Sequence, residues 1–269
     1  MALLFAYEDR EYLLSPGETL ETDLGVLEVP EDVQPGETVE THLGTEFVAR
    51  KLRGPDLFHH LERTGAPMMP RDVGLIVGHT GVAASDRVLD AGTGTGILAA
   101  TLGRLEADVV TYERDEEFAA VARENMELAG VANTVDVRTG DVTDHLDAFT
   151  TDATSDETSP STEPHDTPSA SDAPAESGLR FDVITLDTED APLVVERAPD
   201  LLVPGGFVAV YSPFVEGTRD VVETATDVGL SEVQTYETIQ RQMDFDERGS
   251  RPSTAGVGHT GYLTFARKV

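Results

Sequence analysis

The sequence predicts an α/β fold, in which a mostly parallel sheet is covered by helices on both faces and follows a small β-rich domain. From about residue 72 onward, buried-strand patterns alternate with amphipathic helix patterns, which is typical of a parallel sheet built from repeated βα units. The first part of the chain instead combines alternating polarity with glycine turns, which favours short antiparallel strands. The chain of 269 residues is long enough for both parts, which we expect at residues 1–62 and 63–269.

The N-terminal region carries an internal repeat. Residues 17–25, GETLETDLG, return as GETVETHLG at residues 36–44. Each copy places a glycine turn before a short strand pattern, so we expect a small β-barrel or β-sandwich made of hairpins. Such a region is either a structural module that repeats itself or an appendage that binds substrate, and the repeat is compatible with both.

The α/β region divides into elements in chain order. We expect five parallel strands, at residues 87–91, 108–114, 135–141, 181–187 and 207–212. Helices are expected at residues 96–105, 115–130 and about 191–203, with Gly130 as the C-cap of the second and Pro-Gly-Gly at the end of the third. The last two strand patterns, residues 232–245 and 261–269, have no helix between them. They should form an antiparallel hairpin that completes a seven-stranded sheet.

Residues 150–178 interrupt this alternation. The segment is acidic, has no hydrophobic periodicity and contains almost no large apolar residue. Such a segment cannot bury enough surface to fold, so we expect a disordered acidic insertion on the surface.

The charge balance is strongly acidic, with 51 Asp and Glu against 19 Lys and Arg and a net charge of −32. One interpretation is an acidic binding surface. The other is a halophilic adaptation to a salt-rich cytoplasm, where hydrated carboxylates keep a screened protein soluble. We favour the second because the acids are spread along the chain instead of clustered.

Other features of the composition exclude several classes of protein. Cysteine is absent, which excludes disulfides and thiolate metal sites, and the seven histidines are scattered, so we expect no metal. No apolar run is long enough to cross a bilayer, and the N-terminal residues meet charge too early for a secretory signal. We therefore expect a cytoplasmic protein with no membrane partner.

A glycine-rich turn follows the first strand of the α/β region. Residues 88–96 read VLDAGTGTG, and residues 94–99, GTGILA, match the dinucleotide-binding fingerprint G-x-G-x-x-G/A in sequence. Asp90 counts against a dinucleotide, because a carboxylate at the mouth of the loop would repel a pyrophosphate. The same carboxylate would attract the cationic amino-acid part of S-adenosylmethionine, and a P-loop is excluded because no Lys-Ser/Thr follows. The loop residues expected to contact this cofactor are Gly92, Thr93, Gly94, Thr95 and Gly96.

Acidic residues also end the next two strands. Glu113, with Arg114 beside it, lies about twenty residues beyond the loop, where a carboxylate accepts both ribose hydroxyls of a nucleotide. Asp141 ends the third strand and is expected to accept from the adenine amino group, with the N–H of Val142 nearby. Helix N-capping explains each acid singly, but not three acids at consecutive strand ends. The set is typical of class I methyltransferases.

The fourth strand ends in LDTEDAP, residues 186–192. In folds of this kind the methyl acceptor lies at this strand end, so Asp187 is the candidate for chemistry. A capping aspartate is the alternative interpretation of this motif alone.

Four segments together resemble one family, the tRNA (adenine-N1)-methyltransferases that modify the T-loop. They are RTGAPMMPRD (63–72), the cofactor loop LDAGTGTGILA (89–99), LDTEDAP, and RPSTAGVGHTGYL (251–263). The last is similar to a C-terminal hairpin that generic methyltransferases lack, and the small N-terminal β domain also agrees. The sequence departs from the family at Met69, where Tyr is common, and at Leu193, where Trp is common.

The resemblance implies a Rossmann-like fold, S-adenosylmethionine as cofactor, tRNA as substrate and a homotetramer. The target would be the T-loop adenosine at position 58 and, as in archaeal members, the neighbouring position 57 too. Asp187 would accept a hydrogen bond from the 6-amino group of the flipped adenine and offset the positive charge that develops on methylation.

Further residues are expected to contact the substrate. Met69 and Arg71 in the loop before the cofactor turn, and His259 and Tyr262 in the C-terminal hairpin, would wall the pocket. Arg50, Lys51 and Arg53 form the densest basic stretch and would contact tRNA. The alternatives are that His259 is satisfied within its own turn and that the basic residues pair with surrounding acids.

Two other functions stay open at this point. A methyltransferase for a small molecule or a protein would explain the acidity, but would leave the N-terminal region and the hairpin without a role. A catalytically silent partner subunit is the second, and the intact acids Asp90, Glu113, Asp141 and Asp187 argue against it.

Overall fold

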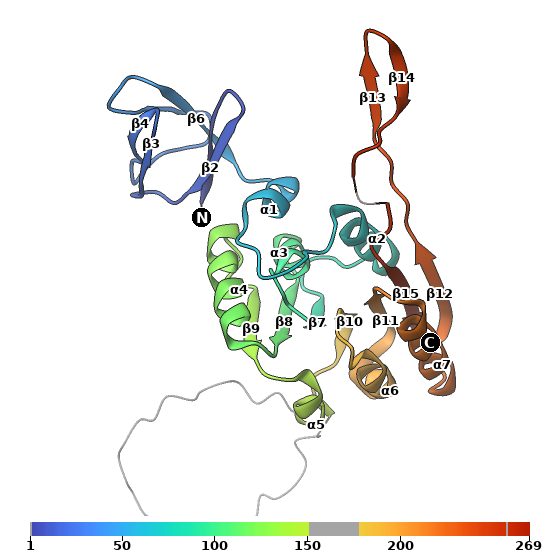
Figure 1. Cartoon of the computed structure of the whole chain (residues 1–269). Coiled ribbons are helices and arrows are strands. Elements are labelled where there is room, and N and C mark those ends of the chain that lie inside the picture. The colour runs from blue at the N-terminus through green and yellow to red at the C-terminus, as the bar shows by residue number, and fades with distance from the viewer. Residues whose placement is uncertain (1, 151–177, 257) are drawn as a thin grey trace, which may run out of the picture.

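The computed structural model of the chain describes residues 2–150, 178–256 and 258–269. Most of the expected acidic insertion, residues 151–177, lies outside the described residues. The larger part of the molecule is a three-layer α/β arrangement, with a smaller β-rich part beside it (Figure 1).

The central sheet has seven strands in the order β12-β15-β11-β10-β7-β8-β9. Their bounds are Arg87–Ala91 (β7), Asp108–Glu113 (β8), Val135–Thr139 (β9), Phe181–Leu186 (β10), Leu202–Ser212 (β11), Ser231–Glu237 (β12) and Tyr262–Arg267 (β15). The strands from β7 to β11 pair in parallel, and β15 is antiparallel to both of its neighbours. The predicted mostly parallel sheet with an antiparallel C-terminal pair is confirmed.

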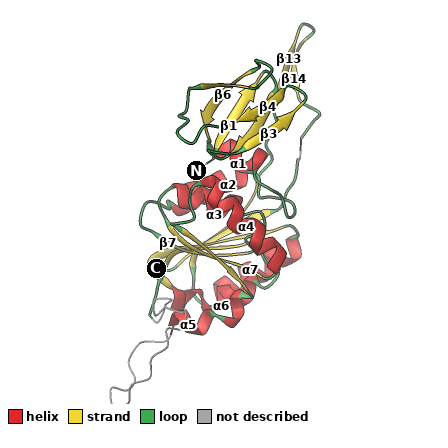
Figure 2. Ribbon diagram, turned by 90° about the vertical axis from the view of Figure 1, so that its left-hand side faces the viewer, coloured by secondary structure: helices red, strands yellow, loops and turns green. Residues whose placement is uncertain are grey.

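Helices cover both faces of the sheet (Figure 2). One face packs against α2 (Pro70–Thr80), α3 (Ile97–Arg104) and α4 (Glu116–Ala129), and the other against α5 (Leu146–Thr150), α6 (Ala191–Leu201) and α7 (Val215–Asp227). Consecutive residues of β7 separate the two cores, because Val88 belongs to the first cluster and Leu89 to the second. This alternation is why the parallel strands read as almost continuous apolar runs.

The N-terminal part is a small β structure with its own core. A four-stranded sheet consists of β2 (Arg10–Leu14), β1 (Leu3–Tyr7), β6 (Glu46–Lys51) and β5 (Thr38–Glu40), and β3 (Thr19–Thr22) pairs with β4 (Gly25–Glu28). The two copies of the sequence repeat supply β3 and β5. Phe5, Leu27 and Phe47 are fully buried between these strands.

A short helix connects the two parts of the chain. In α1 (Gly54–His60), Leu57 packs into the core of the α/β part, and the Arg104 guanidinium donates to the carbonyl of Leu52 at 2.6 Å. The N-terminal strands therefore stand against the face of the molecule that carries α1, α3 and α4 (Figure 2).

The C-terminal region differs from the expected arrangement in two places. Residues 232–245 are not one strand, because β12 ends at Glu237 and residues Met243–Asp246 (β13) instead pair with Gly249–Pro252 (β14). This second hairpin projects away from the sheet (Figure 1). The second difference is at Pro-Gly-Gly, residues 204–206, which does not end α6 as expected. The helix α6 ends earlier, at Leu201, and Pro-Gly-Gly belongs to β11, where the register with β10 shifts and Gly205 has φ +89°.

The helix α7 was not expected from the sequence. It buries Val221 and Ala225 against the sheet, and its exposed face is polar. No helix among the described residues is long and apolar enough to span a bilayer.

Candidate active site

The glycine turn after β7 is pressed against the end of β10. Gly92 has φ +89°, and a Cβ at this position would lie 2.1 Å from the backbone oxygen of Asp187. The Asp187 N–H in turn donates to the Ala91 carbonyl at 2.8 Å. Only glycine therefore fits at position 92, and the turn fixes where the Asp187 backbone lies.

Gly94 is different, because its open side faces empty space. Its φ is +51°, and nothing lies within 4 Å of where a Cβ would be. A ligand can therefore approach the backbone closely at this glycine, and α3 begins three residues later, with Gly96 as its N-cap. Thr93 and Thr95 are buried on the inner side of the turn: the Thr93 hydroxyl contacts that of Thr111, and the Thr95 hydroxyl accepts from the N–H of Thr64.

Asp90 does not lie at an open mouth of the loop, as the sequence suggested, but is buried beneath it. Its side chain accepts hydrogen bonds from the hydroxyls of Thr111, at 2.6 Å, and Thr185. Burial raises the pKa of Asp90 above its ordinary value, although the two threonine hydroxyls oppose this effect. Asp90 contributes to a small cavity of about 40 Å³ that is also lined by Met68, Gly94 and Asp187.

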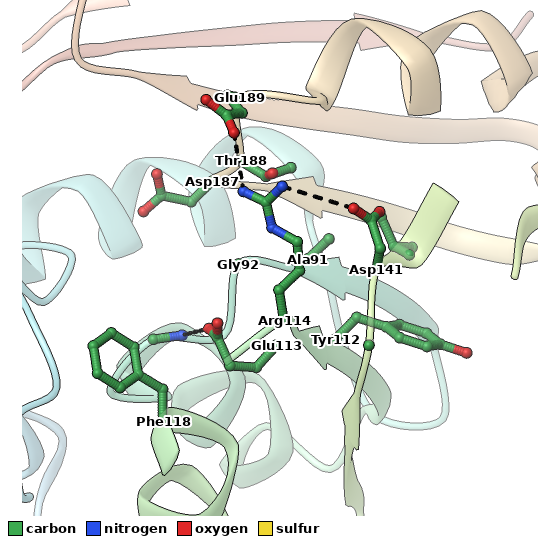
Figure 3. Close-up of a pocket in the computed structure, with 13 residues that line it drawn as sticks. Ala91, Gly92, Tyr112, Glu113, Arg114, Phe118, Asp141, Asp187, Thr188 and Glu189 are labelled. Atoms are coloured by element: carbon green, nitrogen blue, oxygen red, sulfur yellow. Dashed lines mark hydrogen bonds and ion pairs between the residues drawn. The ribbon is translucent and has the colours of Figure 1, made fainter. Parts of the chain in front are cut away.

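A larger pocket of about 410 Å³ lies outside the turn, and we refer to it as the loop pocket (Figure 3). Its lining comes from the carboxyl ends of β7, β8, β9 and β10, and includes Gly92, Gly94, Glu113, Arg114, Phe118, Asp141, Val142 and Asp187. All ten predicted cofactor residues line this pocket or the small cavity beside it, and Glu113 and Asp141 stand on two walls of the loop pocket.

The Glu113 carboxylate is held in place by two backbone donors. The N–H of Gly94 donates to its Oε2 at 2.9 Å, and the N–H of Asp115 donates to its Oε1 at 3.1 Å. Glu113 therefore couples the end of β8 to the glycine turn. Each carboxylate oxygen keeps further acceptor capacity towards the pocket.

Asp141 combines capping with exposure to the loop pocket. Both the hydroxyl and the N–H of Thr143 donate to its Oδ1, at 2.7 and 2.9 Å, which holds the pKa of Asp141 below its ordinary value. The residue is thus the N-cap of the short 3₁₀-helix Val142–Asp144, and Val142 is buried at its start. Its other oxygen, Oδ2, lies 3.7 Å from the Arg114 guanidinium.

Arg114 bridges two loops at the rim of the loop pocket. Its guanidinium contacts Asp190 at 3.0 Å and Glu189 at 3.2 Å, both in the segment after β10. It also faces Asp141 after β9, and Figure 3 shows the contacts with Glu189 and Asp141. About half of the side chain is exposed. The arginine therefore ties the segment that carries Asp187 to the opposite wall.

Asp187 lies where three hollows meet, since it lines the loop pocket, the small cavity and a further pocket of about 400 Å³. Its surface is open to the solvent in these hollows, but protein surrounds it on the remaining sides. This enclosure, followed by the nearby charge of Asp90, raises the pKa of the Asp187 carboxyl to about 7. Among the described residues no hydrogen-bond donor pairs with its carboxylate, so the group is available to a ligand.

The further pocket lies between the N-terminal ends of α6 and α7, and we refer to it as the α6–α7 pocket. It shares Asp187, Thr188 and Glu189 with the loop pocket. The rest of its lining is Ala191, Pro192, Tyr211, Ser212, Pro213, Phe214, Gly217, Asp220 and Val221. Tyr211 and Phe214 were not among the predicted site residues, although both follow the apolar core of the fifth parallel strand.

Two motifs that lie about 190 residues apart in the sequence meet beside this pocket. The Arg71 guanidinium donates to the Thr260 hydroxyl at 3.1 Å, and that hydroxyl donates to Asp72 at 2.9 Å. The Tyr211 hydroxyl donates to the Thr260 carbonyl, so the network reaches the lining of the α6–α7 pocket. Arg71 is almost completely buried, which makes its observed role the connection between the loop and the hairpin.

The other predicted substrate residues do not line the pockets that adjoin Asp187. Met69 is the N-cap of α2; His259 is paired with Glu237 at 2.7 Å and lies against the ring of Tyr262. At the end of β6, Arg50 pairs with Glu11, while Lys51 and Arg53 are exposed. The structure therefore separates these residues from the predicted cofactor residues, which line the loop pocket and the small cavity.

The residues present fit S-adenosylmethionine. The open backbone at Gly94 admits a close approach, the carboxylates of Glu113 and Asp141 can accept from ribose hydroxyls and an adenine amino group, and Asp90 lines the small cavity that adjoins them. Among the residues described, no group of three or more His, Asp or Glu side chains is arranged to hold a metal ion.

Comparison with known proteins agrees with this arrangement. Residues 75–153 match the family model for ribosomal protein L11 methyltransferase. A tRNA (adenine(57)-N(1)/adenine(58)-N(1))-methyltransferase from Methanocaldococcus jannaschii is 31% identical over 98% of this chain and 95% of its own length.

Two solved structures support the fold. A SAM-dependent O-methyltransferase from Thermotoga maritima is similar with a TM-score of 0.73 at 23% identity, over 100% of this chain and 92% of that one. A tRNA (m1A58) methyltransferase from Aquifex aeolicus gives a TM-score of 0.68 at 20% identity, over 100% and 97%. The full-length relative, in contrast to the short family match, covers the N-terminal strands and the C-terminal hairpin as well.

Proposed function

The chain belongs to the family of tRNA (adenine-N1)-methyltransferases, and from this premise we propose that it transfers a methyl group from S-adenosylmethionine to N1 of a T-loop adenosine in tRNA. The target is the adenosine at position 58, and position 57 is a second candidate because the full-length relative is named for both. The observation that carries the proposal is the position of Asp187, where the loop pocket meets the α6–α7 pocket.

The loop pocket is proposed to hold the cofactor. Glu113 would accept from the ribose hydroxyls and Asp141 from the adenine amino group, while the backbone of Gly94 allows close contact. When bound, S-adenosylmethionine supplies a methyl group that is already activated for attack. What is left for the protein is to position the acceptor nitrogen and to stabilise the charge that develops on it.

Asp187 is proposed to perform both of these tasks. Its carboxylate has no donor among the described residues, so it can accept a hydrogen bond from the 6-amino group of the adenine. Methylation at N1 leaves the ring cationic and makes this amino group a better donor. The interaction is therefore stronger in the transition state than in the ground state, which is the condition for accelerating the reaction. The adenine N1 lone pair needs no general base.

The net charge of −32 sets a condition on tRNA binding. Contacts to phosphates provide most non-specific affinity for nucleic acids, and this affinity falls steeply with salt. We propose that Lys51 and Arg53, which are exposed, provide a few such contacts, and that shape and stacking provide the rest. Arg50 is already paired with Glu11 and would contribute less. A Lys51→Ala/Arg53→Ala variant should bind tRNA more weakly and with a shallower salt dependence.

We also propose a homotetramer, which the family resemblance implies, and a cytoplasmic location, where a tRNA-modifying enzyme meets its substrate. Multi-angle light scattering of the purified protein tests the first, with a mass of about four times 28.9 kDa as the expected value. A monomeric mass in low and high salt would contradict it.

The function is tested with purified protein, S-adenosylmethionine and tRNA transcripts that carry adenosine at position 57 only, at position 58 only, or at neither. Digestion to nucleosides and mass spectrometry should find N1-methyladenosine in the position-58 transcript and none in the transcript that lacks both. Methylation of a protein fraction or of small molecules, with every transcript untouched, would refute the proposal.

A further inference from the structure

The α6–α7 pocket contains an exposed aromatic ring that has no role in the reaction proposed above. Phe214 is 71% exposed, whereas Phe5, Phe47 and Phe149 are completely buried. Its backbone is nevertheless well fixed, because the Phe214 carbonyl accepts from both the N–H and the hydroxyl of Thr218 in the first turn of α7. Among the described residues no other ring contacts it. The structure thus holds an unpaired aromatic ring on the wall of a pocket.

The charge of this pocket restricts what can enter it. The described residues that line it include three carboxylates, those of Asp187, Glu189 and Asp220, and no Lys or Arg. Phosphate groups would be repelled there. A neutral base would be admitted, and a base that becomes cationic on methylation would be stabilised. The volume of about 400 Å³ falls within the range of roughly 300–1,000 Å³ that is usual for small-ligand sites.

The distribution of side chains within the pocket matches the two parts of a purine. Asp187 can accept from the edge that carries the amino group, whereas Pro192, Pro213 and Phe214 present apolar surface to the faces of the ring. Tyr211 is less available for stacking, because its ring packs against the backbone of Gly261 and its hydroxyl is bonded to Thr260. Phe214 is the aromatic residue of the pocket that is left for a ligand.

We infer that Phe214 stacks on the target adenine in the α6–α7 pocket and is a specificity-determining residue for the acceptor base. The inference rests on the proposed function. It adds that the flipped base enters the hollow between α6 and α7, with its face on Phe214 and its amino edge on Asp187, while the phosphates stay outside.

The kinetic test compares Phe214→Ala, Phe214→Leu and Phe214→Trp with the wild type on one tRNA transcript. Loss of a base–aromatic stack should lower kcat/KM for tRNA roughly 5- to 100-fold in the Ala variant. The Leu variant should remain impaired because it restores apolar area but no aromatic face, whereas the Trp variant should recover most of the activity. The dissociation constant for S-adenosylmethionine should be unchanged in all three. Leu105→Ala is the control for loss of an exposed apolar side chain, because Leu105 is partly exposed and lies at the C-terminal end of α3, away from the glycine turn.

A second measurement reports stacking directly. The chain contains no tryptophan, so Phe214→Trp introduces a single tryptophan, which can be excited selectively over the six tyrosines. Its emission should be quenched by a tRNA with adenosine at the target position and should change much less with the same tRNA made abasic there. The emission of a Leu105→Trp control should respond to neither.

Different outcomes separate the inference from the function on which it rests. If the wild type methylates tRNA and Phe214→Ala is within twofold of it, or Phe214→Leu restores full activity, the stacking role is wrong and the function stands. Equal fluorescence with intact and abasic tRNA has the same meaning. If the wild type leaves every transcript unmodified, the proposed function itself is wrong.

Discussion

Replacement of Gly92 by alanine tests how tightly the cofactor turn and the Asp187 segment are joined. The new Cβ would lie 2.1 Å from the Asp187 oxygen, where ordinary contact begins at 3.4 Å, so the two segments would have to separate by about 1.3 Å. The residue would also be held at φ +89°, which L-residues rarely adopt. Both the stability of the fold and the position of the proposed catalytic carboxylate should suffer.

The expected magnitudes follow from these two effects. A left-handed backbone costs an alanine about 1–2 kcal/mol, and overpacking at a tight contact costs about 1–3 kcal/mol more. The free energy of unfolding should therefore fall by roughly 2–5 kcal/mol. A displacement of about 1 Å at a reacting group can cost on the order of 100-fold in rate, so methylation at saturating substrates should fall by about that factor.

Gly81→Ala is the matched control. Gly81 caps the end of α2 at φ +68° and has nothing within 4 Å of its open side, so its replacement adds the backbone cost without a clash. Urea unfolding of both variants separates the two contributions, and single-turnover methylation measures the displacement of Asp187. Equal stability losses in the two variants, together with wild-type turnover in Gly92→Ala, would refute the reasoning.

Three further predictions concern the surroundings of the site. Enclosure raises the pKa of Asp187 to about 7, and only the ionised carboxylate is a pure hydrogen-bond acceptor, so kcat/KM should fall as the pH drops through 7. The Asp187→Asn variant should not show this fall at low pH. A wild-type kcat/KM that is constant from pH 6 to 8 would count against the proposed role of Asp187. Asn125 is completely buried; its side chain accepts from the Glu62 N–H and donates to the carbonyls of Glu62 and Thr95, which holds the linker on the glycine turn. Asn125→Ala should therefore lower the free energy of unfolding by about 2–3 kcal/mol in urea titrations, and a loss under about 0.5 kcal/mol would contradict this. Arg114→Ala should weaken cofactor binding only about 2- to 5-fold, as measured by calorimetry, because exposed ion pairs contribute little. The affinity for the cofactor should also depend less on salt in this variant. A loss of all binding would mean that Arg114 contacts the cofactor itself.

The sequence predicted best what depends on local pattern. The strand Arg87–Ala91, the glycine turn and the helix Glu116–Ala129 with its Gly130 cap all lie where periodicity and capping residues place them. The convergence of Glu113, Asp141 and Asp187 was also predictable, since the carboxyl ends of neighbouring parallel strands share one edge of a sheet.

What could not be predicted depends on partners that are distant in the sequence. Asp90 is buried because it bonds to Thr111 and Thr185, which arrive on two other strands, so the letters around it gave no indication that its carboxylate faces inward. Arg71 similarly reads as a surface cation until Thr260 is placed beside it. Phe214 could be read from its own segment only as another apolar residue, because the pocket that it lines is completed by Asp187 and Pro192, which come from the segment after β10.

The single-turnover rate of N1-methyladenosine formation in Asp187→Asn, measured with saturating S-adenosylmethionine and tRNA, tests the central claim most directly. Asparagine keeps the size of the side chain but removes its negative charge, so the rate should fall by at least about 100-fold while the cofactor affinity stays within a few-fold of the wild type. A rate equal to that of the wild type would mean that the carboxylate at the junction of the two pockets does not present the base.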